Sequence, residues 1–321
     1  MWSNPSHRED VQRATPPVGR LSCQTLDVTG DCALSLPAPK YRSALRDRTR
    51  IITPAGTRRP PAKPGQIRYG SNVPLLSKML ADAKELNRSE LLGLHGAESA
   101  AVVDALDHLH ALAAFHSWTF DGWADAVPHA AHAVLFTCFH KTLFSLHAAH
   151  ELTLDGLYGI ARPHLRHAFE SLMIAKFCAT DPDSDVYDKW IDGLDLYFTN
   201  GLLRKIAHPK TDEFSRAWGL LCRWSHATVF ANQLSLDLET TREEASLNLS
   251  FIGVLIHFTY HLLNSHILTP TIKCYSQRYR EELSCAQSRA CLKVALATLR
   301  ADLGPGSRRL IKDFRATWRM K

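Results

Sequence analysis

The chain has 321 residues, of which 45% are apolar and 22% are charged, a composition typical of a soluble globular protein. Its formal net charge of +6 is unevenly placed, because residues 1–70 carry 12 Lys and Arg against 5 Asp and Glu, whereas the rest carries 26 against 27. The first residues lack the apolar segment of a secretory signal. These features argue against secretion and predict a cytoplasmic protein.

Residues 1–70 form a predicted disordered basic arm. They contain 9 of the 16 prolines and show neither a helical nor a strand period. Their excess of positive charge is compatible with binding to nucleic acid or to another anionic surface. Two alternatives stay open: the arm is a transit peptide, or translation begins at Met79, the next methionine.

Helical periodicity begins near Val73 and continues to residue 303, which predicts one helical bundle domain over residues 71–303. A first short helix starts at Pro74 and is interrupted by residues 87–90 and by the glycines at 93 and 96. No run with a period of two residues is bounded by turn signals, so no sheet is expected. The fold class is all-α with about seven or eight helices. After the first, these cover residues 98–118, 128–151, 154–178, 186–206, 213–232, 243–265 and 278–303.

Residues 304–321 form a predicted basic, amphipathic tail helix. Its apolar stripe consists of Leu310, Ile311, Phe314 and Trp318. The positively charged residues around the stripe are Arg308, Arg309, Lys312, Arg315, Arg319 and Lys321. The stripe predicts a helix that docks on the bundle, and contact with nucleic acid or a membrane surface is the alternative. The most apolar segment, residues 251–268, includes three histidines and Asn264, which favours a core helix over a membrane span. No membrane partner is therefore expected.

Motifs for cofactors, metals and disulfides are missing. The eight cysteines form no C-x-x-C pair, and most lie in apolar helical runs, which predicts free thiols in a reducing compartment. The sequence has no glycine-rich phosphate loop, no nucleophile elbow and no H-E-x-x-H or E-x-x-H motif. We therefore expect no cofactor and no metal.

The predicted site centres on residues 154–178. An apolar stripe there has the spacing of one buried helix face and consists of Leu165, Phe169, Leu172, Met173 and Phe177. Arg166 and Glu170 lie one turn apart on its flank. They form either an ion pair that fixes helix register or a phosphate-binding arginine beside acid–base groups. Ser225 and His226, on another apolar helix, need a polar partner that this pair could supply.

Two segments carry a resemblance to a known group of proteins. LRHAFESLMIAKF, residues 165–177, resembles the R-x-x-(L/F)-(F)-E signature of bacterial helical proteins related to the HEPN superfamily. WSHATVF, residues 224–230, is similar to their S-H element. The resemblance implies a helical-bundle homodimer that cleaves RNA without metal, as a toxin or an anti-phage effector.

That resemblance also implies roles for an R-x(4–6)-H motif. The arginine stabilises the scissile phosphate, and the histidine transfers a proton at the ribose 2′-hydroxyl. Arg162 and His167 match the spacing, with Arg166 and His226 as alternatives for the two roles. The function expected from it is that of a metal-independent endoribonuclease, and the alternative is a non-catalytic helical module that binds a protein or a nucleic acid.

The geometry of a helix separates these two functions. Five residues along a straight α-helix turn by about 500°, which leaves Arg162 and His167 about 140° apart. They converge only if the helix breaks or begins at Pro163. Convergence of Arg162, His167 and His226 would favour catalysis, and divergence would favour the binding module.

Overall fold

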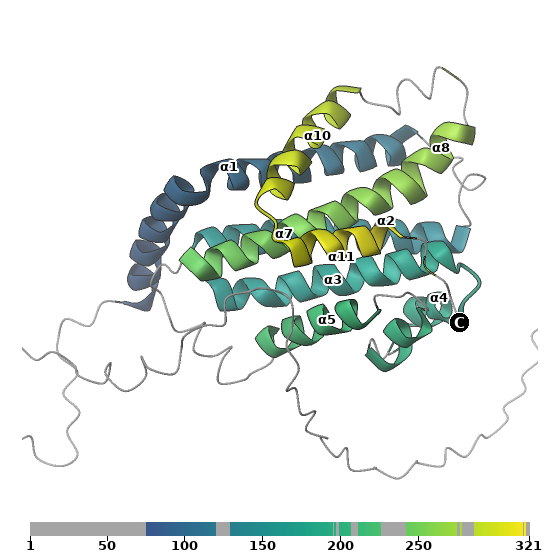
Figure 1. Cartoon of the computed structure of the whole chain (residues 1–321), viewed down its shortest axis with the longest axis horizontal. Helices are drawn as coiled ribbons and strands as arrows, with labels where there is room; N and C mark the ends of the chain where they lie inside the picture. Colours follow the sequence, from purple (N-terminus) through teal and green to yellow (C-terminus); the bar gives the residue numbers. More distant parts are fainter. Residues whose placement is uncertain are drawn as a thin grey trace, which may run out of the picture. The chain divides into compact units, whose positions relative to one another are not determined.

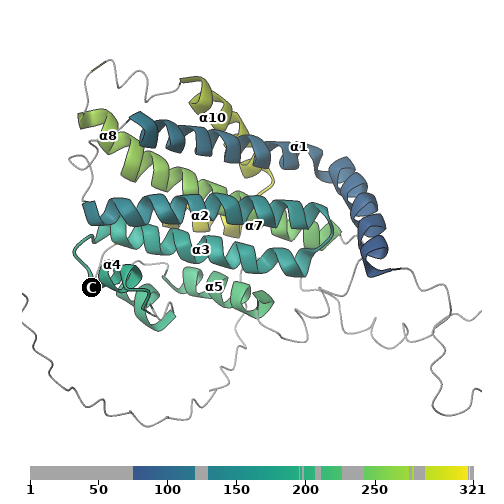
Figure 2. The same cartoon turned by 180° about the vertical axis from the view of Figure 1, so that it is seen from behind.

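The computed structural model describes residues 75–119, 129–194, 196, 199–206, 211–225, 242–274, 277, 286–316 and 318, all in one compact unit. Within these residues the chain forms nine α-helices and two short π-helices, with no strand, so the predicted all-α class is confirmed (Figures 1 and 2). The predicted arm, residues 1–70, and His226 lie outside the described residues.

Helix α1, Leu76–Thr119, replaces the two helices that the sequence predicts at this end of the bundle. It bends at His95, whose backbone angles (φ −124°, ψ 23°) are not helical. The bend lies between Gly93 and Gly96, two residues of low helix propensity. The predicted interruption is therefore a kink, while the polar residues 87–90 continue the helix.

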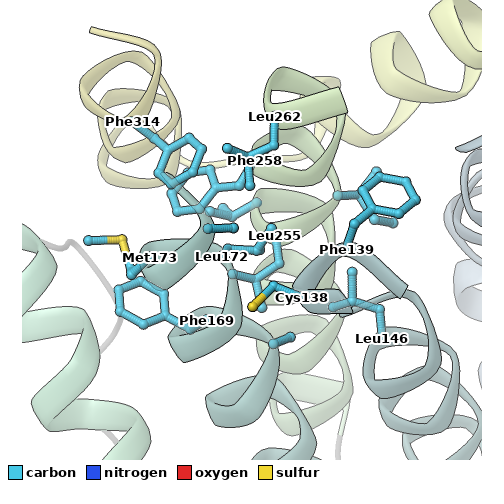
Figure 3. Close-up of a cluster of buried hydrophobic side chains, with 14 of the residues drawn as sticks. Cys138, Phe139, Leu146, Phe169, Leu172, Met173, Leu255, Phe258, Leu262 and Phe314 are labelled. Atoms are coloured by element: carbon cyan, nitrogen blue, oxygen red, sulfur yellow. The ribbon is translucent and has the colours of Figure 1, made fainter. Parts of the chain in front are cut away.

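Helices α2, His129–Leu154, and α3, Tyr158–Thr180, form an antiparallel hairpin joined by a tight turn. They pack against each other and against α7, Arg242–Leu262, to enclose the main core (Figure 3). The side chains there are apolar and almost fully buried, and they include Phe139 and Leu146 of α2, Phe169 and Leu172 of α3, and Leu255 and Phe258 of α7. The apolar stripe predicted for residues 165–177 is the face of α3 that enters this core.

The prediction of a single helix over residues 186–206 is wrong. Helix α4 covers only Asp185–Ile191, and a π-helix, η3, follows at Thr199–Leu203. Gly193 ends α4 because it adopts φ +67°, a left-handed conformation that caps helices. The Leu194 N–H donates to the Lys189 carbonyl (2.8 Å), which is the hydrogen bond of such a cap.

Helix α7 continues through a π-helix, η4 (Leu263–Leu268), into α8, Thr269–Cys274. Pro270 explains the wide turn, because proline has no N–H for the carbonyl of the residue four positions earlier and its ring clashes with that carbonyl. The stretch 242–273 is long and apolar enough to cross a membrane, but most of it is buried in the bundle, as in core helices that pass the same test.

Three further helices complete the described bundle: α5, Thr211–Ser225; α10, Ala286–Ala301; and α11, Pro305–Arg315. Helix α5 packs on α3, α10 packs on α1, and α11 packs on α7 (Figure 1). The predicted tail helix therefore begins at Pro305, directly after Gly304, and docks on the bundle.

The α2–α3 turn gives a test of the fold. Gly156 has φ +78°, and a Cβ atom there would collide with the Asn87 side chain of α1. We expect Gly156→Ala to lower the free energy of unfolding by about 1–3 kcal/mol in urea denaturation. Gly219→Ala is the matched control, because Gly219 lies inside α5 with open space around it, and it should stabilise by about 0.5–1 kcal/mol. Equal effects of the two variants would contradict this turn geometry.

Candidate functional site

Arg162 lies in the interior of the bundle, with no exposed surface. Its Nε donates to Asn248 Oδ1 (3.1 Å), and a terminal guanidinium nitrogen donates to the carboxylate of Glu244, both on α7. The guanidinium carbon lies 4.2 Å from the ring centroid of Trp224 on α5. The charge of Arg162 is thus neutralised within the protein.

The network around Arg162 extends to a third helix through Asn248. Asn248 Nδ2 donates to Thr153 Oγ1 (3.2 Å) at the end of α2 and to the Tyr158 carbonyl (3.4 Å) at the start of α3. Thr153 Oγ1 in turn donates to the Ala149 carbonyl (2.7 Å). These bonds connect α2, α3 and α7, which is a structural role.

Arg162 and His167 do not form one site. Helix α3 is continuous from Tyr158 to Thr180, with Pro163 inside it, so the break at Pro163 that would bring the two together does not occur. Arg162 faces α7, whereas His167 is exposed. The R-x(4–6)-H spacing is therefore present in sequence, while the two side chains lie on different faces.

Arg166 and Glu170 lie on the side of α3 that faces α5. Arg166 Nε and Glu170 Oε1 are 3.2 Å apart, and each side chain is 24% exposed. The guanidinium of Arg166 lies over Trp218 of α5, with 4.5 Å between its carbon and the ring centroid. The sequence left two interpretations of this pair, an ion pair and a phosphate-binding arginine. The geometry matches an intrahelical ion pair at the α3–α5 contact.

Ser225 is the last residue of α5 and lies beside Trp224, the ring that packs on Arg162. Its Oγ donates to the Leu221 carbonyl (2.7 Å) one turn earlier, as mid-helix serines often do. His226, the neighbour with which Ser225 was predicted to act, is outside the described residues.

A second polar cluster joins α3, α7 and η4. Lys176 of α3 is only 3% exposed, and its Nζ lies 3.1 Å from His261 Nε2 and 3.3 Å from His266 Nε2. Ser265 Oγ lies 3.2 Å from His261 Nδ1. The aromatic rings of Phe314 and Trp318 lie 5.8 and 5.6 Å from the Lys176 amine. We call Lys176, His261, Ser265 and His266 the lysine–histidine cluster.

The π-helix explains why the two histidines meet. Five residues along a regular α-helix would leave His261 and His266 about 140° apart. The wider turn of η4, in which the Thr269 N–H bonds the Asn264 carbonyl, returns the second ring to the first. Their ring centroids are 5.8 Å apart and the rings are nearly perpendicular.

Burial shifts the protonation of this cluster. It lowers the pKa of Lys176 to about 8 and, together with the positive charges of Lys176 and Arg315, lowers the pKa of His261 to about 3. Burial and Lys176 lower the pKa of His266 to about 4. At neutral pH the amine is therefore largely charged, and both imidazoles are neutral acceptors.

Helix α11 has two faces of opposite character. Leu310, Ile311 and Phe314 are buried, and Phe314 stacks on Phe258 of α7 with 3.9 Å between ring centroids. The exposed side carries Arg308, Arg309, Lys312 and Arg315, which we call the basic face. Arg309 pairs with Glu213 of α5 (3.0 Å), and no carboxylate in the described part of the chain pairs with the other three.

Positive charges lie close together at the basic face of α11. Burial and the nearby Arg300 of α10 lower the pKa of Arg315 from its ordinary value, although a guanidinium stays charged at neutral pH. An anion bound beside Arg300 and Arg315 would relieve their repulsion.

The described residues contain no group of three His, Cys, Asp or Glu side chains able to hold a metal ion. The described cysteines Cys138, Cys178, Cys222 and Cys291 are free, and burial raises the pKa of Cys138 and Cys178 to about 12. Cys138 and Cys178 are therefore protonated thiols at neutral pH.

The sequence matches no protein-family model, no curated protein and no solved structure. Function is therefore argued from this chain's own geometry.

The lysine–histidine cluster is the feature that sequence reasoning missed. Lys176 lies between Met173 and Phe177 of the apolar stripe, where its burial is foreseeable. Its partners are 85 and 90 residues away, and the five-residue spacing of the two histidines is unproductive on a regular helix. The signal that could have found them is Pro270, which predicts a local helix distortion.

The buried Arg162 network predicts a specific pattern of stability. Arg162→Met leaves the carboxylate of Glu244 buried without its cation, and we expect a loss of about 3–5 kcal/mol in urea denaturation. The double variant Arg162→Met/Glu244→Met should recover most of that loss, because the orphan charge is gone. Arg166→Met is the control, with an expected loss of at most about 1 kcal/mol for a partly exposed pair. Tolerance of Arg162→Met alone would contradict the structural role.

The histidine pKa values predict acid sensitivity. Between about pH 6.5 and 4 the unfolded chain binds protons at His261 and His266 that the folded protein does not, so stability falls as pH falls. Each histidine contributes at most about 1.4 kcal/mol per pH unit. His266→Gln should flatten the decline in melting temperature over this range, whereas His147→Gln, an exposed histidine on α2, should leave it unchanged. A parallel decline in all three proteins would contradict the burial of neutral histidines.

Proposed function

We propose that this protein binds RNA through the basic face of α11. One observation carries the proposal: the apolar side of α11 is packed on the bundle, while its exposed side presents Arg308, Arg309, Lys312 and Arg315. Cations held at helical spacing on a rigid support can contact successive phosphates of a polyanion. Arg300 of α10 adds a further positive charge beside Arg315.

The packing of α11 favours nucleic acid over a membrane surface. An amphipathic helix binds a membrane by inserting its apolar side among the lipids. Here Phe314 stacks on Phe258, and Trp318 packs against Phe214 with 5.9 Å between ring centroids. The apolar side is thus already occupied, and only the charged side is available. The choice of RNA among polyanions rests on the HEPN-like resemblance of residues 165–177 and 224–230.

The proposal does not include cleavage by the predicted arginine–histidine pair. Arg162 is buried against Glu244, and His167 is exposed on another face of α3, so the two cannot act on one phosphate in this arrangement. The described geometry favours the binding module over a nuclease built on that pair. A nuclease that uses His226 stays a prediction, since His226 is outside the described residues.

RNA binding can be tested by fluorescence anisotropy with a labelled, unstructured RNA oligonucleotide and the full chain. We expect affinity to fall with salt, and Arg308→Glu/Lys312→Glu to weaken binding about ten-fold or more and to reduce the salt slope by about 0.7 for each lost phosphate contact. Lys78→Glu/Lys141→Glu is the matched control, because these exposed lysines lie on α1 and α2, whereas α11 packs on α7.

Two results would overturn the proposal. One is wild-type protein that binds no RNA at low salt. The other is an equal loss of affinity in the α11 variant and in the control, which would assign binding to overall charge or to the basic residues 1–70 and not to α11.

A further inference from the structure

The first part of α1 has an apolar face that stays exposed in the described part of the chain. Leu76, Met79 and Leu86 are 70%, 42% and 67% exposed, and Leu80 and Ala83 are half-buried. These five residues recur at i, i+3, i+4, i+7 and i+10, the spacing of one helix face, and we call them the α1 stripe. A contiguous group of exposed apolar side chains marks an interaction surface.

A different side of the same segment holds it on the bundle. Lys84 and Arg88 form ion pairs of 2.7 and 2.9 Å with Asp155, in the turn between α2 and α3. Leu91 has no exposed surface and packs in a small cluster with residues of α2, α3 and α7. These anchors lie about a third of a turn from the α1 stripe. They fix the rotation of the helix, so the stripe cannot turn toward the bundle.

The bend at His95 sets this segment apart from the rest of α1. Figures 1 and 2 show the first part of the helix turned away from the second part. Residues 76–94 form a helix about 28 Å long, at 1.5 Å per residue. Helices of this length are marginal in water unless an apolar face is buried. The segment would therefore be stabilised by a partner on the stripe.

The α1 stripe is symmetric about residue 81. Leu76 and Leu86 lie five residues on either side of it, and Met79 and Ala83 lie two residues on either side. Two such helices can pair antiparallel with residue 81 of each at the centre. Leu76 then packs opposite the partner's Leu86, and Met79 packs opposite the partner's Ala83. A large side chain faces a small one next to the two-fold axis, as a self-complementary contact requires.

The charges of the segment also favour a second copy over other occupants. Residues 76–94 carry three Lys and Arg against three Asp and Glu, so two copies do not repel each other. Helices that lie on membranes are rich in Lys and Arg, which this balance does not match. Residues 1–70 do not match the stripe either, because their nine prolines prevent a long helix that could pair with it.

We propose that the protein forms a homodimer through the α1 stripe, with the two copies of residues 76–94 paired antiparallel about a two-fold axis. Leu75, which is 75% exposed directly before α1, extends the apolar area. Because the stripe spans only about three helical turns, the dimer dissociates on dilution. The contact involves neither the basic face of α11 nor the lysine–histidine cluster, so it is independent of the proposed RNA binding.

Sedimentation equilibrium of the full chain over a range of concentrations tests the dimer. We expect the wild-type mass to rise from 36.0 kDa toward twice that value as the concentration increases. Leu76→Gln/Leu86→Gln should raise the dissociation constant about ten-fold or more, because both copies lose two apolar contacts. Circular dichroism melting of the monomeric variant should match that of the monomeric wild type, since both side chains are exposed in the single chain.

Phe144→Gln/Val294→Gln is the matched control. These side chains lie on α2 and α10 and are 72% and 68% exposed, so the same amount of apolar surface is replaced away from the stripe. The control should dimerise as the wild type does.

An exchange of sizes tests the antiparallel register. Ala83→Met alone crowds the partner's Met79 and should weaken the dimer. Met79→Ala/Ala83→Met returns one large and one small side chain to each contact and should restore it.

Four results would overturn the inference, and none of them bears on RNA binding. Wild-type protein can stay monomeric at every concentration. The control can lose as much self-association as the α1 variant, which would assign the dimer to another surface. The size exchange can fail to restore the dimer. Finally, a monomer whose α1 variant melts at a lower temperature, or no longer binds phosphatidylserine vesicles that the wild type binds, would assign the stripe to another segment of the chain or to a membrane.

Discussion

The ion pair between Arg162 and Glu244 is the constraint on which the bundle depends. The two residues are 82 positions apart in sequence, yet they meet where Arg162 has no exposed surface. A buried ion pair adds little net stability over apolar side chains, but an arrangement that separates the partners leaves charges buried alone. Because Asn248 extends the pair to Thr153 and Tyr158, the registers of α2, α3 and α7 are fixed together.

That register sets the positions of the other polar groups. Lys176 follows Arg162 by about four helical turns and so lies on the same face of α3, at the far end of its contact with α7. Glu244 and Asn248 of α7 face Arg162, while His261 at the other end of α7 faces Lys176. At one end of the α3–α7 interface a carboxylate neutralises the charge of Arg162. At the other end no carboxylate in the described part of the chain pairs with Lys176. This asymmetry separates the neutralised Arg162 network from the lysine–histidine cluster.

Helix α11 joins the core to the surface. Its Phe314 packs beside Phe258 in the core (Figure 3). The same ring lies 5.8 Å from the Lys176 amine, so one side chain contacts both the core and the lysine–histidine cluster. With the apolar side held in this way, Arg308 and Lys312 face solvent. The packing of α11 therefore places the proposed RNA contact beside the lysine–histidine cluster.

The sequence by itself determined the features that depend on neighbours along the chain. The helical period of residues 128–151 and 154–178 predicted α2 and α3 within a few residues, and the stripe of residues 310–318 predicted a docked α11. Local signals failed where a single backbone conformation decides the outcome, as at Gly193, which ends α4 early. Only the tertiary structure decided that Arg162 meets Glu244 and that Lys176 meets His261 and His266. Such contacts depend on helix register and on one wide π-turn, and the period of a helix contains no information about which residue of a distant helix lies opposite.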